Sequence, residues 1–379
     1  KIESKLINNS YTSDCKYISN FQFFIILIIV LISNTTAIGQ TFSMKGQLWS
    51  SSLTNNDVPD SQSSFESTLG YIPTLSLSKN LTNKQLFDME WSYRLERVYS
   101  GNALLNDNKE HHRYWVRYSS EKLEARLGLQ KIIFGPSLVL RSLSWFDTID
   151  VKDPTGQTDG VEAFRLRWFP SNTLTVWSWS ILNDQNTLSY GGRTELSTNK
   201  GEWGFTFHHD PSKSLQTIGQ MEIPIFSPQN RLAIDYRYDG YIGFWNESTR
   251  IQFDDLEIGM ITIGADYTLP VANGILVMTE SMQITRKTND STSTQLYTAF
   301  MASLPVGMIH QLMFISQIDW EENLNYHYLR WSATYDRYSL NLIVSTSPKR
   351  ADYNLPEQSL SRSLAGFGTG LQIMFIYNH

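Results

Sequence analysis

Cysteine, charge and long apolar runs are all scarce in this chain of 379 residues. The single cysteine, Cys15, lies near the start, so the rest of the chain has no thiol for a disulfide, a metal site or catalysis. Charged residues make up only 18%, which is low for a soluble protein. A net charge of −6 and the lack of a basic stretch argue against nucleic-acid binding. We therefore expect no nucleic-acid partner, no cofactor and no metal ion.

The clearest apolar run is residues 21–33, whose 13 residues fall short of the roughly 20 that a helix needs to span a membrane. Residues 37–39, Ala-Ile-Gly, follow it with the small-x-small pattern that signal peptidase cuts. We expect residues 1–39 to be a secretory signal peptide cleaved before Gln40, with a membrane anchor as the alternative. The chain begins with Lys rather than Met, which is compatible with a fragment or with extra residues from a mis-called frame within this segment.

Apolar and polar residues alternate along much of the chain. In residues 86–96, Phe87, Met89, Trp91 and Tyr93 share one parity, and charged or polar residues occupy the other. The pattern recurs at residues 123–130, 164–168, 203–208, 232–239, 328–335 and 366–377. Period-two alternation is typical of β-strands that have one dry face and one wet face.

Short turns and longer polar loops connect these strands in alternation. Tight turns are predicted at 80–83, 119–122, 170–172, 199–201, 271–274, 305–307 and 335–337. Longer loops are predicted at 51–66, 99–110, 132–160, 183–192, 245–256, 287–293, 319–325 and 347–362. This wiring is typical of outer-membrane barrels. We predict an all-β fold, a transmembrane antiparallel up-and-down β-barrel over residues 40–379. Eighteen strands fit best, and 16 is the alternative because the joints at 208–214 and 223–245 are weak.

Large aromatic side chains on the apolar faces favour lipid, rather than a protein core, as their partner. Aromatic residues make up 13% of the chain and gather near predicted strand ends, as in the girdles of membrane barrels. The predicted lipid-interface residues are Trp91, Tyr93, Trp168, Trp177, Trp179, Trp331, Phe375 and Tyr377. Glu280 conflicts with this pattern, because it shares the parity of Met278 and Ile284, and a mid-bilayer charge costs up to about 2–4 kcal/mol.

The segment 132–160 is long for a loop but is not composed like a disordered one. Its apolar residues 138–146 could form a short helix that packs inside the barrel and narrows it; the alternative is a cap over the mouth. Folded inward, Asp147, Asp150, Asp153 and Asp159 would face a wall carrying Arg126, Arg165 and Arg167, which would create a transverse field. The predicted pore-lining residues are Arg126, Gln130, Arg141, Asp147, Asp150, Asp153, Arg165, Arg167, Asp235, Arg237 and Arg330.

Residues 125–170 also carry a family resemblance. A strand with Arg-x-Gly-x-Gln is followed by a Gly, a loop with Asp-Pro, and a Gly-Val that opens an Arg-bearing strand. The matching positions are Arg126, Gly128, Gln130, Gly135, Asp153, Pro154, Gly160, Val161, Arg165 and Arg167. This segment resembles Gram-negative outer-membrane porin-like proteins of Bacteroidetes type, although Phe134 stands where such proteins often have Trp. The resemblance implies a diffusion channel or an uncharacterised barrel of this type.

We predict a channel in the cell outer membrane for passive diffusion of small hydrophilic or charged solutes. A plugged barrel that binds a partner is the alternative; it would need bulky apolar residues pointing inward, whereas the predicted inward rows are charged, Gly or Ser. A hydrolase is less favoured, because the adjacent residues of His111–His112 and His208–His209 point to opposite faces of a strand. Expected partners are outer-membrane lipid, the barrel-assembly machinery during insertion, small solutes and further copies of the chain.

Overall fold

The computed structural model describes residues 40–82, 84–183, 186–212, 216–218, 223–225, 228–271, 273–353 and 360–379. Residues Phe42–His379 form one compact unit. The predicted signal peptide, residues 1–39, lies outside the described residues and remains a prediction. Within the described ranges, no helix is long and apolar enough to cross a membrane.

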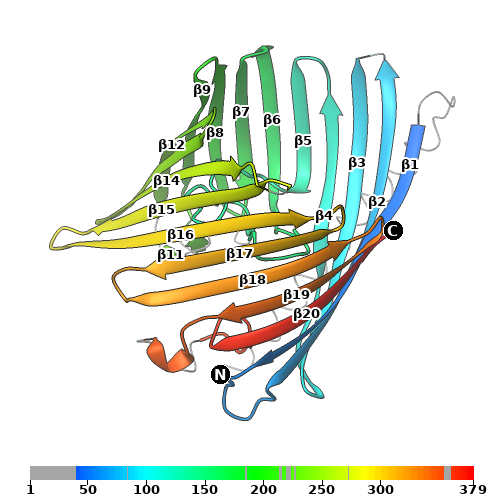
Figure 1. Ribbon diagram of the computed structural model, residues 1–379. Coiled ribbons are helices and arrows are strands. Elements are labelled where there is room, and N and C mark those ends of the chain that lie inside the picture. The colour runs from blue at the N-terminus through cyan, green and yellow to red at the C-terminus, as the bar shows by residue number, and fades with distance from the viewer. Residues whose placement is uncertain are drawn as a thin grey trace, which may run out of the picture. The chain divides into compact units, whose positions relative to one another are not determined.

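Strands account for almost all of the regular structure (Figure 1). Among the residues described, one short 3-10 helix, η1 (Arg350–Asp352), lies in the connection between the last two strands. The strands are β1 (Gln40–Asn55), β2 (Phe65–Thr82), β3 (Gln85–Ser100), β4 (Ala103–Ser119), β5 (Leu123–Gln130), β6 (Val161–Ser171), β7 (Leu174–Leu182), β8 (Leu188–Thr198), β9 (Gly201–Asp210), β10 (Gln216–Ile218), β11 (Ile223–Ile225), β12 (Gln229–Asp239), β13 (Gly243–Phe253), β14 (Leu256–Leu269), β15 (Ile275–Lys287), β16 (Thr292–Val306), β17 (His310–Asp319), β18 (Leu324–Thr334), β19 (Tyr338–Thr346) and β20 (Thr369–Asn378).

Eighteen of these strands form one closed antiparallel barrel. Each strand pairs with its neighbours in the chain, and β9 pairs directly with β12, because β10 and β11 form a separate hairpin within the connection. The first and last strands close the barrel, with Trp49 opposite Ile376. The predicted number of 18 strands is confirmed, and the weak joints resolve into β9, the β10–β11 hairpin, β12 and β13.

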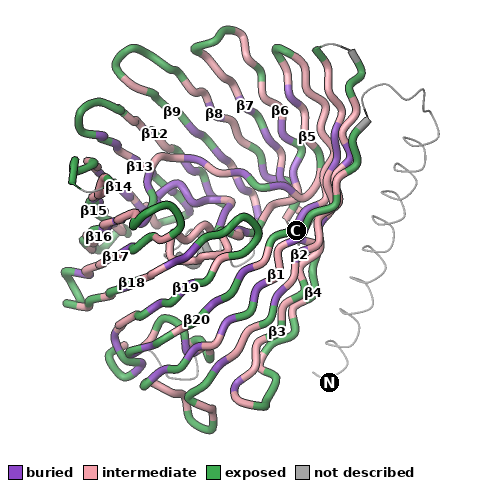
Figure 2. The backbone as a smooth tube through the Cα atoms, turned by 45° about the vertical axis from the view of Figure 1, so that its right-hand side comes forward, coloured by how far each residue is buried: buried purple, intermediate pink, exposed green. Residues whose placement is uncertain are grey.

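Alternation assigns each strand residue to the inside or the outside of the barrel, because directly opposed residues share a face. Phe205 and Ile234 are opposed on β9 and β12 and are exposed on the outer face. Their neighbours Thr206 and Asp235 are buried on the inner face. Figure 2 shows buried positions recurring along the strands and exposed positions gathering at the turns and loops.

Two segments predicted as long loops are mostly strand. Residues 99–110 contain only a two-residue turn, since β3 ends at Ser100 and β4 begins at Ala103. The ladder continues through polar residues there, with Asn106 opposite Val98. Residues 245–256 likewise belong to β13 and β14, with a turn at 254–255. Polar composition does not end a strand whose backbone hydrogen bonds continue, and this explains both errors.

Candidate functional site

The connection from β5 to β6, residues 131–160, contacts the inner wall on opposite sides of the barrel. Gln130, fully buried at its start, donates from Nε2 to the Ala163 carbonyl at 2.9 Å and so ties the two strands where the segment leaves them. Farther on, Tyr328 of β18 donates to the Lys152 carbonyl at 2.6 Å, and Gln157 donates to Gln47 of β1 at 2.7 Å. The segment therefore crosses the interior.

Two buried carboxylates of the far wall hold the segment. Glu247 of β13 accepts hydrogen bonds from the amide of Ser137 at 2.8 Å and from the amides of Ser142 and Leu143 at 2.9 and 3.1 Å. The Ser142 hydroxyl adds a bond of 3.0 Å to the same carboxylate. Gly135 makes this approach possible, because it has φ +80° and a Cβ there would collide with the Glu247 carboxylate.

Glu280 of β15 is the second carboxylate of this clamp. It accepts from the amides of Leu138, Val139 and Leu140 at 2.8, 2.9 and 2.6 Å, and from Trp245 Nε1 at 3.2 Å. These amides therefore donate to side chains rather than to backbone carbonyls four residues earlier. This is why the segment contains no helix, contrary to the helix expected over residues 138–146.

The conflict at Glu280 has a structural resolution. Glu280, Met278 and Ile284 all face inward and are buried, while Ser281 and Gln283 lie on the exposed outer face. The parity read from the sequence is correct, but the apolar face of this strand is the inner one. The crossing segment supplies an apolar partner inside the barrel, and only the tertiary fold reveals it.

Apolar side chains fill the space between the crossing segment and one part of the wall. Phe134, Leu143 and Trp145 of the segment belong to the main buried apolar cluster. Their partners from β13 to β17 include Ile251, Ile258, Met278, Met282, Ile284, Met301, Met313 and Ile315. This side of the barrel interior is packed and dry.

Trp177 and Trp179 of β7 join the same cluster, so their predicted contact with lipid is wrong. Both are buried, and their ring centroids lie 5.7 and 5.2 Å from that of Phe134. They are paired with Arg167 and Arg165 across β6 and β7 and share the inward face of those arginines. An apolar inner face was not expected because the crossing segment that covers it could not be placed from the sequence.

The remaining predicted interface aromatics lie on the outer face. Trp168 is 50% exposed and Phe375 is 40% exposed, which is high for side chains of this size in a folded chain. Trp331 and Tyr377 are partly exposed and lie opposite the exposed Leu312 and Tyr338. Trp91 and Tyr93 stack with centroids 6.3 Å apart. Contact of these six with lipid remains a prediction.

The arginines of β5 and β6 form a row on the inner wall, with Arg126 directly opposite Arg165. One carboxylate of the same wall pairs with two members of the row, since Glu124 lies 2.8 Å from Arg165 and 3.8 Å from Arg126. On the neighbouring strand β4, Arg117 pairs with Asp88 at 2.6 Å. Two guanidinium groups of the row also lie over aromatic rings: that of Arg126 is 4.3 Å from the ring centroid of Trp115, and that of Arg167 is 4.2 Å from the ring centroid of Trp177.

The acids of the crossing segment have other partners than this arginine row. Asp147 pairs with Arg141 inside the segment, and both side chains are buried. Asp150 lies 3.6 Å from Lys152, Asp153 accepts from Thr155, and Asp159 lies 3.3 Å from Arg94. Within the described residues, none of the four forms an ion pair with Arg126, Arg165 or Arg167. The predicted transverse field between the two rows therefore gains no ion pair from these residues, and it remains a prediction.

The other predicted pore-lining residues are also engaged at the wall. Arg237 pairs with Asp239 at 2.8 Å and approaches Asp266 at 3.7 Å. Arg330 lies 3.7 Å from the sulfur of Met313. Asp235 is buried and receives two hydrogen bonds from Arg193, at 2.6 and 2.9 Å. Contact of these residues with a passing solute remains a prediction.

The Arg193–Asp235 pair gives a test of the interior. Replacing Asp235 with Ala is expected to lower the free energy of unfolding by about 1.5–3 kcal/mol, because the buried Arg193 loses its two hydrogen bonds to Asp235 and, among the described residues, keeps only Glu195, at 2.9 Å, as an ion-pair partner. The double variant with Arg193→Ala should lose less. Urea titration of the folded band in unheated gel electrophoresis measures both. Lys84→Ala, in an exposed pair with Glu121, is the control at about 0–1 kcal/mol. Equal effects of Asp235→Ala and the control would contradict this.

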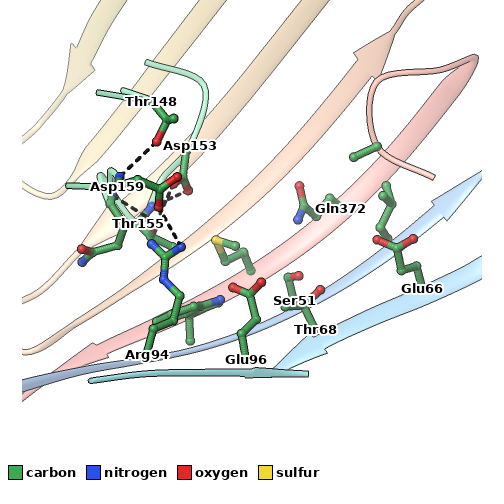
Figure 3. Close-up of a pocket in the computed structure, with 15 residues that line it drawn as sticks. Ser51, Glu66, Thr68, Arg94, Glu96, Thr148, Asp153, Thr155, Asp159 and Gln372 are labelled. Carbon is green, nitrogen blue, oxygen red and sulfur yellow. Dashed lines mark hydrogen bonds and ion pairs between the residues drawn. The ribbon is translucent and has the colours of Figure 1, made fainter. Parts of the chain in front are cut away.

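A cavity of about 340 Å³ remains on the other side of the crossing segment (Figure 3). Its walls are β1, β2, β3 and β20, the crossing segment, and Ala365 from the connection between β19 and β20. Five of the lining residues are charged, namely Glu66, Arg94, Glu96, Asp153 and Asp159. In the part of the chain that the structure describes, no three His, Cys, Asp or Glu gather as a metal site would require. The expectation of no metal remains a prediction.

Comparison with known proteins shows the fold. No family model and no curated protein matches this chain. Among solved structures, OccK2 (OpdF) of Pseudomonas aeruginosa superposes with a TM-score of 0.58 at 9% identity, covering 89% of this chain and 97% of that one. OmpT of Vibrio cholerae, in its trimer form, gives 0.52 at 9% identity over 90% of this chain and 100% of its own. An anion-selective porin from Comamonas acidovorans gives 0.50 at 12% identity, covering 90% and 100%. The chain therefore has the fold of outer-membrane porin-like β-barrels.

Proposed function

We propose that this chain is an outer-membrane channel for passive diffusion of small hydrophilic or charged solutes. The observation that carries the proposal is the divided interior of the closed barrel. One segment crosses the interior, packs dry against one side, and leaves a polar cavity of about 340 Å³ on the other. Such a layout supports a narrowed aqueous path. Likeness to porins below 15% identity supports the proposal at the level of the fold only.

A plugged barrel that binds a partner is the second candidate. The observation that favours it is the apolar inner face of β13–β17, where Ile258, Met282 and Ile315 are fully buried. This face departs from the inward rows of charged and small residues predicted from the sequence. Bulky apolar residues pointing inward are what a permanent plug requires, so conduction has to be measured directly.

Single-channel recording of the full chain, purified in detergent and inserted in a planar bilayer, tests the two candidates. We expect discrete and stable conductance steps, because the polar cavity leaves room for hydrated ions. A heat-modifiable, folded barrel that stays silent would contradict the channel and support the plugged barrel. An empty detergent preparation from the same host is the control.

Membrane lipid, the barrel-assembly machinery and further copies of the chain are its proposed partners. Exposed outer-face residues such as Phe164, Trp168, Phe205 and Phe375 suit a lipid surface. One of the solved barrels with this fold is described as a trimer. We assign the chain no catalytic role. Its signal peptide and its Bacteroidetes-type resemblance remain predictions.

A further inference from the structure

The barrel interior has two sides that differ in polarity: a packed apolar side, and an open side that contains the cavity. The apolar cluster joins the crossing segment to β7 and to β13–β19. The charged groups along that contact are buried: Glu247 and Glu280 accept from amides of the segment, and Arg193 and Arg231 lie over the rings of Phe134 and Trp145. The cavity lies instead against β1, β2, β3 and β20. Under the proposed function, a hydrated solute would meet the lining of this cavity.

That lining carries an excess of negative charge. Glu66, Glu96, Asp153 and Asp159 contribute four carboxylates, and Arg94 contributes the one guanidinium, which gives −4 + 1 = −3. The other ten lining residues are uncharged. Figure 3 shows Glu96, Asp153 and Arg94 around the cavity, with Glu66 at its far end.

Arg94, whose charge is already included in this sum, has carboxylates as its neighbours. It lies 3.3 Å from Asp159 and 3.7 Å from Glu110 on β4. Asp153 accepts hydrogen bonds from the amide and hydroxyl of Thr155, at 2.9 and 2.6 Å, which are neutral donors that leave its charge in place. Glu66 accepts from Ser363 and from the Leu364 amide in the same way.

Glu96 differs from the other three carboxylates. Among the described residues it has neither a hydrogen bond nor an ion pair, and its side chain lines the cavity. The arginine row of β5 and β6 does not line the cavity, and its members Arg165 and Arg126 pair with Glu124 on their own wall. The uncompensated charge next to the open space is therefore negative.

We infer that the channel prefers cations over anions, and that Glu96 is a main determinant of this preference. The inference rests on the proposed function, because it describes the solutes that the open side admits. A net negative, narrow lining raises the local concentration of cations and lowers that of anions. Small ammonium-bearing solutes would be favoured over carboxylates for the same reason.

Reversal potentials under a potassium chloride gradient test the inference. The full chain is inserted in a planar bilayer near 0.1 M salt, where the Debye length is about 10 Å and the lining charges are not fully screened. We expect a cation-to-anion permeability ratio above about three for the wild type. Glu96→Gln should reduce that ratio by roughly half, and Arg94→Gln should raise it. Glu121→Gln, in the exposed turn between β4 and β5, is the matched control and should leave it unchanged.

The outcomes separate the two proposals. Conductance steps with a ratio at or below one, or a Glu96→Gln variant with the wild-type ratio, would overturn cation selectivity and leave the channel standing. A folded barrel without conductance would overturn the channel and the selectivity together. Because Glu96 makes no structural hydrogen bond, loss of folding is not expected in its Gln variant, and unheated gel electrophoresis confirms this for each preparation.

Discussion

Removal of the Glu280 carboxylate is expected to detach the crossing segment from the barrel wall while the strands stay folded. In Glu280→Ala, the amides of Leu138, Val139 and Leu140 and the indole nitrogen of Trp245 lose their acceptor. Each buried donor left unpaired costs about 1–3 kcal/mol. The part of the segment around residues 138–140 would then move away from β15 so that its three amides can bind water, while Glu247 still holds Ser137, Ser142 and Leu143.

The expected readouts are noisier single-channel currents with a higher mean conductance, and faster proteolysis within residues 131–160. Glu280→Gln should be intermediate, since its amide oxygen still accepts while its nitrogen faces the same donors. Glu322→Ala, in the exposed turn between β17 and β18, is the control that removes a carboxylate without a buried partner. Wild-type currents and wild-type proteolysis in Glu280→Ala would show that the clamp does not hold the segment.

Replacing residues 136–158 by a short Gly/Ser linker is expected to give the largest change in conductance, an increase of several-fold. The replacement removes Val139, Leu140, Leu143 and Trp145, which pack on the apolar inner face of the barrel, and it removes one wall of the cavity. Both changes widen the aqueous cross-section. The newly exposed inner face of β13–β17 is apolar, so the variant should also lose stability against urea.

A Gly/Ser replacement of residues 136–158 that keeps their number tests whether the length of the segment or the packing of its side chains narrows the barrel. It keeps the chain length but cannot pack on Ile258 or Met282, and its conductance should lie nearer to the deletion than to the wild type. Unchanged conductance in the deletion variant, with a folded barrel, would mean that the segment does not narrow the path. A silent wild type that conducts only after the deletion would identify the segment as a plug.

The sequence by itself determined the barrel and its strand number. The alternation of apolar and polar residues, as in residues 203–208, matches the structure because successive side chains of a strand point to opposite faces of the barrel wall. Tight turns such as 199–201 punctuate the strands at the expected places. The outward positions of Trp168 and Phe375 follow from the same parity. Strand alternation, turns and the facing of side chains depend on residues close together in the chain, so they can be predicted from the sequence.

Only the tertiary structure decided whether the apolar face of a given strand points outward or points inward to the crossing segment. Trp177 and Met282 lie on apolar faces that look like the others in the sequence, yet they point inward. The pairing of Asp159 with Arg94, and the clamp made by Glu247 and Glu280, join residues distant in the chain. The charge of the open side was likewise hidden, because it depends on which carboxylates the fold leaves without a partner once the long segment has crossed the barrel.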